Sequence, residues 1–176
     1  MKNKMMITLL AVGSALTATH AFAAAGTVNF NGNILDSACD VDVASQHQVV
    51  VLGDYYKTEF PTTGARTAAT QFNIVLKNCP VTVTNAKVRF DGTPDATNSS
   101  LLAIDSSAAG AATGVAINLM SADKADLPLH GSNSYSYVLS STADNTLSFY
   151  AQYISTAATV TAGPANSVAN FSVVYN

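Results

Sequence analysis

The sequence contains no tryptophan and little charge. Of its 176 residues, 8 are Lys or Arg and 11 are Asp or Glu, a charged share of 11%, where soluble domains average about 25%. So few basic residues exclude a nucleic-acid-binding protein, which needs a basic surface. The apolar share of 48% and the net charge of −3 exclude a disordered chain. A surface of Ala, Ser, Thr and Asn instead suggests a protein that works outside the cell or packed against other copies of itself.

Long apolar runs are also lacking, apart from one short run at the N-terminus. Lys2 and Lys4 precede an apolar stretch that ends near residue 16, and the small-x-small triplet 21–23 (AFA) follows it. These are the three parts of a secretory signal peptide, and the run is shorter than the ~20 residues that span a bilayer. We therefore predict a signal peptide over residues 1–23, export of the remaining chain, and no stable membrane insertion.

Cysteine is scarce, with only Cys39 and Cys79 in the chain. In an oxidising compartment a lone pair forms one disulfide, and closing a loop of about 40 residues stabilises a fold by roughly 4 kcal/mol. A redox pair or half of a metal site are the alternatives. The chain has no C-x-x-C motif, and His47 and His130 show no metal-ligand spacing with either cysteine. We predict the disulfide.

Motifs for catalysis and cofactor binding are absent as well. The chain has a single Glu, Glu59, and no G-x-S-x-G sequence. Asp40 and Asp42 are two residues apart, but the rest of a calcium-binding loop is missing. We expect no catalysis, no cofactor and no metal site.

Short segments with alternating apolar and polar residues fill most of the chain after residue 40. They are rich in Val, Ile, Phe and Tyr, and clusters of Gly, Pro, Asn, Asp and Ser separate them. The pattern predicts one all-β domain, an antiparallel β-sandwich, with a flexible surface loop over residues 106–114. The strands are expected over residues 48–52, 72–77, 86–90, 101–104, 115–120, 135–139 and 147–154.

Both ends of the exported chain also alternate. At the N-terminal end, the positions that carry an apolar side chain or none are Val28, Phe30, Gly32 and Ile34, with an Asn between each pair. At the C-terminal end they are Ala169, Phe171, Val173 and Tyr175. We expect a strand at each end. Since an unprotected strand edge allows another chain to pair with it, these ends are candidate sites of self-association.

Several motifs together resemble those of pilin subunits of chaperone–usher fimbriae, close to the type 1 major subunit. The resemblance covers nearly the whole exported chain, and no single motif would be specific alone. The motifs are GTVNFNG at 26–32, Cys39 within SACDV, Cys79 after FNIVLKN, NTLSFYAQY at 145–153, Gly163 as the fourteenth residue from the C-terminus, and the penultimate Tyr175.

This resemblance implies an incomplete immunoglobulin-like sandwich that lacks its final strand and is completed by a donated strand. Residues 24–34 would be the N-terminal donor-strand extension, and residues 35–176 the pilin body. The residues of the C-terminal strand that would line the open groove and pair with the chaperone are Gly163, Ala169, Phe171, Val173 and Tyr175. The implied partners are other pilin subunits, a periplasmic chaperone and an outer-membrane usher, and the implied location is a fimbria on the cell surface.

Two other functions fit parts of this pattern. The short extension is also typical of a minor tip-adaptor pilin of the same system. A secreted carbohydrate-binding β-sandwich would share the fold class, but it would act as a monomer without a donated strand.

Overall fold

The computed structural model describes residues 26–32, 34 and 38–175. The predicted signal peptide, residues 1–23, lies outside the described residues. The chain divides into two compact units, Met1–Ile34 and Leu35–Asn176, each described by itself below. In the described part of the chain, no helix has the length and apolarity needed to cross a membrane.

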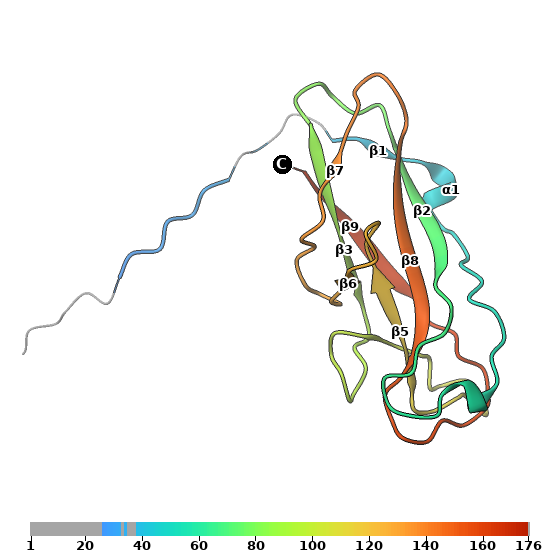
Figure 1. Ribbon diagram of the computed structural model, residues 1–176. Coiled ribbons are helices and arrows are strands. Elements are labelled where there is room, and N and C mark those ends of the chain that lie inside the picture. The colour runs from blue at the N-terminus through green and yellow to red at the C-terminus, as the bar shows by residue number, and fades with distance from the viewer. Residues whose placement is uncertain (1–25, 33, 35–37, 176) are drawn as a thin grey trace, which may run out of the picture. The chain divides into compact units, whose positions relative to one another are not determined.

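The regular secondary structure of the larger unit consists almost entirely of strands, which loops connect (Figure 1). Its two helical elements are one turn each, α1 (Val43–Gln46) and a 3-10 turn (Lys57–Glu59). The strands are β1 (Asp40–Val41), β2 (Thr70–Lys77), β3 (Asn85–Gly92), β4 (Leu102–Ala103), β5 (Val115–Met120), β6 (Asp126–Leu127), β7 (Tyr137–Val138), β8 (Asn145–Ser155) and β9 (Ala169–Tyr175).

The strands form two antiparallel sheets. The larger sheet has the order β1-β2-β8-β5-β4, with β6 also paired to β5, and the smaller has the order β7-β3-β9. In the larger sheet β8, drawn in orange, runs between β2 and β5 (Figure 1). The predicted antiparallel β-sandwich is therefore confirmed, and β9 lies at one edge of the smaller sheet.

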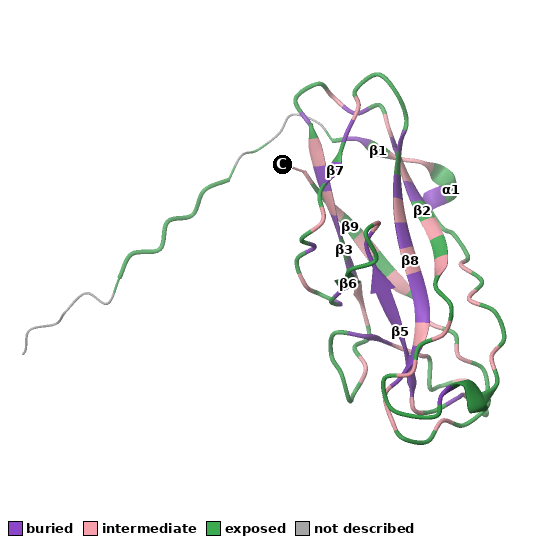
Figure 2. Ribbon diagram, in the orientation of Figure 1, coloured by how far each residue is buried: buried purple, intermediate pink, exposed green. Residues whose placement is uncertain are grey.

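The core lies between the two sheets, and aromatic rings occupy its centre. Phe149 of β8 is fully buried, and its ring centroid lies 5.2 Å from Phe90 of β3 and 5.6 Å from Phe72 of β2. Alternate residues of β2, β3 and β8 are buried beside these rings (Figure 2). The period-two pattern of these segments arises because one face of each strand packs into this core.

Strand β5 departs from the alternation, because all six of its residues are buried. One face of the strand packs into the core through Ile117 and Leu119. On the other face Ala116 packs with Leu101 and Ile154 in a small separate cluster. The loop before β4 therefore covers the outer face of the larger sheet at this point.

A disulfide joins Cys39 and Cys79, as the sequence predicts, with a Cα–Cα distance of 4.2 Å. The bond ties the start of β1 to the end of β2, which also pair through Asp40 opposite Lys77. The side-chain amide of Asn145 donates a hydrogen bond to the Cys79 sulfur at 3.3 Å. The disulfide therefore closes the end of the sandwich at which β8 begins.

The predicted strand over residues 48–52 is wrong. Residues 48–52 pair with no other segment of the described chain, although they keep the burial alternation of a strand. Val49 and Val51 are exposed, whereas Val50 and Leu52 are partly buried and Leu52 packs against the core. The alternation therefore records packing on one face, but the segment lacks the hydrogen-bonded neighbour that would make it a strand.

The predicted flexible loop over residues 106–114 is also partly wrong. Ala112 is buried, and its backbone N–H donates to the Pro164 carbonyl at 2.9 Å. A side chain at Gly163 would collide with the Gly110 carbonyl oxygen and would lie 2.7 Å from the Ala112 nitrogen. Glycine is needed at position 163 because two backbone segments approach each other closely there.

Candidate functional site

The open edge of β9 is the first part of the candidate site. Strand β9 pairs with β3 along its whole length, from Ala169 opposite Gly92 to Tyr175 opposite Ala86. On its other edge, β9 has no strand partner among residues 38–175. That edge presents unpaired backbone N–H and C=O groups, to which another strand can add.

The inward side chains of β9 are only partly covered. Ala169, Phe171, Val173 and Tyr175 all pack against the main core and are half-buried, whereas three of the four residues opposite them on β3 are buried: Ala86, Val88 and Phe90. The Phe171 ring centroid lies 6.5 Å from that of Phe90. The sandwich is therefore well packed up to β3 and incompletely covered at β9.

Tyr175 connects the end of β9 to the disulfide. Its hydroxyl donates to the Cys39 carbonyl oxygen at 3.4 Å. Burial raises the pKa of the Tyr175 hydroxyl above its usual value, so the group stays protonated and remains a donor. This contact between β9 and the segment before β1 marks one end of the partly covered apolar row.

The C-terminal candidates fall into two groups in the structure. Ala169, Phe171, Val173 and Tyr175 lie in one row on β9. Gly163 lies in a bend before β9, where it permits the close approach to the 110–112 segment. The structure therefore separates the role of Gly163 from that of the strand residues.

The second part of the candidate site is the N-terminal segment, which forms no strand over residues 26–32. Its large apolar side chains are exposed, with 77% of Val28, 92% of Phe30 and 101% of Ile34 accessible to solvent. A methyl group placed on Gly32 would meet no other atom within 4 Å. The strand predicted for this segment is therefore wrong for residues 26–32 of the single subunit. Its three large apolar side chains are exposed to solvent.

Sequence reasoning missed a second set of partly covered side chains. Val41 of β1, Leu52 and Phe72 of β2 are half-buried against the same core as the row on β9. The alternation over residues 48–52 is the signal for Leu52, although it predicts a paired strand there, and Phe72 begins the predicted strand over residues 72–77. Residues 48–52 and β9 share partly buried alternation on one face, but of the two only β9 has a strand partner within the described chain.

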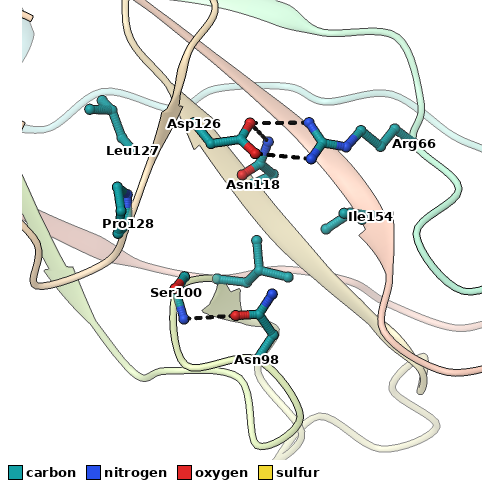
Figure 3. Close-up of a pocket in the computed structure, with 9 residues that line it drawn as sticks. Arg66, Asn98, Ser100, Asn118, Asp126, Leu127, Pro128 and Ile154 are labelled. Carbon is teal, nitrogen blue, oxygen red and sulfur yellow. Dashed lines mark hydrogen bonds and ion pairs between the residues drawn. The ribbon is translucent and has the colours of Figure 1, made fainter. Parts of the chain in front are cut away.

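A small cavity of about 90 Å³, lined by both polar and apolar side chains, lies on the outer face of the larger sheet (Figure 3). Arg66 donates two hydrogen bonds to the Asp126 carboxylate, at 3.1 and 3.0 Å, and the buried Asn118 amide donates a third at 2.8 Å. Ligand pockets usually measure about 300–1,000 Å³. The cavity is too small for such a ligand, and its charged groups already satisfy each other.

Metal and nucleophile sites gain no support from the structure. In the described ranges, no three His, Cys, Asp or Glu side chains gather in a way that could hold a metal ion. His130 contacts Asp91 at 2.8 Å, and Arg89 also bonds this carboxylate at 3.1 Å. This cluster is exposed on the surface of the smaller sheet and has no serine or cysteine in its contacts.

Comparison with protein families decides the identity. A family model described as fimbrial protein matches residues 28–176. The chain belongs to the fimbrial protein family. It is a structural pilin subunit of a surface fimbria, and its fold is the incomplete immunoglobulin-like sandwich of pilins.

Individual relatives agree with this assignment. The type-1 fimbrial protein A chain of Escherichia coli strain K12 is 38% identical over 99% of this pilin and 100% of its own length. A solved type I fimbria protein of Burkholderia pseudomallei is 39% identical with a TM-score of 0.61, covering 85% of this pilin and 97% of that chain. A subunit in a solved chaperone–usher pilus is 28% identical with a TM-score of 0.66, covering 86% and 95%.

The carboxylates of the pilin predict how its stability depends on pH. The Arg66 guanidinium lowers the pKa of Asp126, the His130 ring lowers that of Asp91, and the Lys77 ammonium lowers that of Asp42. A carboxyl with a lowered pKa in the folded state stabilises the fold above its unfolded pKa of about 3.9. This contribution is lost as the pH falls through the folded pKa.

We therefore expect the free energy of unfolding to stay level from pH 7 to about pH 5 and to fall below about pH 4. Urea denaturation at a series of pH values measures this. Asp126→Asn keeps the shape of the side chain but removes a carboxyl group whose pKa is lowered in the folded state. The free energy of unfolding of this variant should therefore fall less steeply below about pH 4 than that of the unaltered pilin. Equal slopes for the two proteins would contradict the role given to Asp126.

Proposed function

We propose that the subunits polymerise by donor-strand exchange, in which residues 24–34 of one pilin add as a strand beside β9 of the next. Donor-strand complementation of pilins is an established case of β-strand addition. The observation that carries the proposal is the free edge of β9, together with the half-exposed row of apolar side chains on that strand. The added strand would extend the smaller sheet from β7-β3-β9 to four strands.

The two segments match in length and pattern. Val28 to Ile34 spans seven residues, as β9 does. Each presents four alternate positions to one face, since successive side chains of a strand point to opposite sides. The donor positions are Val28, Phe30, Gly32 and Ile34, and the acceptor positions are Ala169, Phe171, Val173 and Tyr175.

The expected gain from insertion is large for so short a segment. Three exposed side chains, Val28, Phe30 and Ile34, would become buried. Each contributes roughly 1.5–3 kcal/mol, so together they give at most about 5–9 kcal/mol. The backbone hydrogen bonds of the new ladder add about 1 kcal/mol each. Gly32 has no side chain, which allows the two backbones to approach closely.

The open edge of β9 also implies that the subunit needs a chaperone before it assembles. An uncovered apolar row on an edge strand promotes aggregation, so we propose that a periplasmic chaperone pairs with β9 during transit. An outer-membrane usher then exchanges the chaperone strand for the donor segment of the next subunit. Residues 1–23 direct export, residues 35–176 form the pilin body, and the role is structural and not catalytic.

Removing residues 24–34 and adding them back as a peptide tests this proposal. The truncated body should be unable to polymerise and should unfold at a lower temperature than the same body mixed with the peptide. The peptide stabilises because it binds the folded body in preference to the unfolded chain. Thermal unfolding followed by circular dichroism measures the difference.

A control peptide with Phe30→Asp keeps the length and the backbone but places a charge at the centre of the apolar face. It should raise the unfolding temperature much less than the unaltered peptide. Equal stability of the body with and without the unaltered peptide would refute the incomplete-fold mechanism.

A further inference from the structure

The donor segment contains the one Asn-Gly pair of the whole sequence, Asn31-Gly32. Both residues are exposed and lie outside any helix or strand, and a side chain at Gly32 would meet nothing within 4 Å. Asn98, in the body, is held differently, because its side-chain oxygen accepts from the Ser100 N–H at 3.1 Å. Asn133 also precedes a serine and is buried.

We propose that Asn31 is a site of spontaneous deamidation and isoaspartate formation in the unassembled pilin. The Gly32 backbone nitrogen attacks Cγ of Asn31, and a new C–N bond closes a cyclic imide. The bond from Cγ to Nδ2 breaks, and ammonia leaves with the proton that the Gly32 nitrogen gives up. Water then adds to one of the two imide carbonyl carbons, the bond from that carbon to the Gly32 nitrogen breaks, and the nitrogen takes up a proton from the water. Breaking the bond to Cγ gives aspartate at position 31, and breaking the bond to the main-chain carbonyl carbon gives isoaspartate.

The surroundings of Asn31 favour this reaction. Glycine has no Cβ to shield its nitrogen, and its backbone reaches conformations that other residues avoid. In the described part of the segment, residues 26–32, no strand holds the backbone extended. The Gly32 nitrogen is therefore free to rotate toward the Asn31 side chain.

The consequence for assembly rests on the proposed donor-strand function. In isoaspartate the main chain runs through Cβ and Cγ, so the backbone gains one methylene between Phe30 and Gly32. Phe30 and Ile34 then no longer keep a two-residue period, and a strand register error moves side chains to the wrong face. A subunit with isoaspartate at position 31 is a poor donor.

Insertion of the donor segment beside β9 should slow the deamidation of Asn31. Ladder hydrogen bonds hold an inserted strand in the extended conformation, which keeps the Gly32 nitrogen away from the Asn31 side chain. Asn31 is therefore expected to deamidate in unassembled subunits and to remain asparagine in subunits within a fibre.

The test holds purified full-length exported subunit at low concentration and mildly alkaline pH for several days before assembly is started. Mass spectrometry of the peptide around position 31 then measures isoaspartate in fibres and in the unassembled remainder. We expect isoaspartate to accumulate with time, the assembly-competent fraction to fall in parallel, and the fibres to be depleted in it. Aged subunit without isoaspartate, or fibres with as much as the remainder, would overturn the proposal.

Two variants at position 31 separate the causes. Asn31→Gln slows ring closure because its side chain is one methylene longer, and after ageing it should assemble as well as fresh subunit. Fresh Asn31→Asp carries the new charge without the longer backbone, and it should also assemble. If Asn31→Gln loses assembly on ageing as fast as the unaltered pilin, isoaspartate is not the cause.

Failure of the donor-strand proposal has a different signature. Freshly purified subunit that lacks residues 24–34 would then assemble as well as the freshly purified full-length exported subunit. That result overturns the effect on assembly, whereas the isoaspartate content of the free subunit still supports or overturns the chemistry at Asn31.

Discussion

Val173→Glu is expected to abolish the ability of the pilin to accept a donor strand. Val173 lies in the inward row of β9, opposite Val88 of β3, and is half-buried in the single subunit. Insertion of a neighbour's strand would bury the new carboxylate without a partner, which costs several kcal/mol. Since about 1.4 kcal/mol corresponds to a factor of ten, the affinity for the donor peptide should fall at least about 100-fold.

The neighbouring residue supplies a matched control. Val174 is 51% exposed on the outer face of β9 and lies opposite Lys87. Val174→Glu introduces the same charge in the same strand, but there it faces solvent and an opposite charge. Isothermal titration with the 24–34 peptide should give near-normal affinity for Val174→Glu. Equal loss of affinity in both variants would show that the inward row of β9 is not the acceptor.

Gly32→Leu should prevent a subunit from donating its strand while leaving its body intact. In the single subunit a side chain at position 32 meets nothing within 4 Å, so folding should be unaffected. In the proposed complex the leucine must enter a site that accommodates only a bare backbone, and such overpacking costs typically 1–3 kcal/mol. We expect about a tenfold or greater reduction in fibre yield by electron microscopy.

Asn31→Leu is the control for Gly32→Leu. It adds the same side chain one residue earlier, which the period of two places on the opposite face of the donor strand. Fibre yield should be close to that of the unaltered pilin. Normal filaments from Gly32→Leu, or equal losses from both variants, would contradict the proposed register of the donor strand.

The sequence predicted the main strands and the disulfide well, because these features have local signals. Long alternating segments such as 147–154 pack one face into the core, so their pattern is visible without the fold. The pairing of Cys39 with Cys79 followed from export and from the presence of only two cysteines. The apolar row ending at Tyr175 was also visible as alternation.

Features that depend on neighbours distant in the chain could not be predicted. Residues 48–52 alternate like a strand, but only the fold shows that no partner lies beside them. All six residues of β5 are buried, and on its outer face Ala116 is covered by Leu101 from the loop before β4. The need for glycine at position 163 depends on the 110–112 segment, about fifty residues earlier in the chain.

Mixing the two defective variants tests the central claim most directly. Val173→Glu has an intact donor and a defective acceptor, whereas Gly32→Leu has a defective donor and an intact acceptor. Each variant alone should form few or no fibres, and an equimolar mixture should form mainly a dimer that grows no further. Size-exclusion chromatography with light scattering measures this. Monomers only, or fibres of mixed composition, would contradict polymerisation by a strand donated from the N-terminus and accepted beside β9.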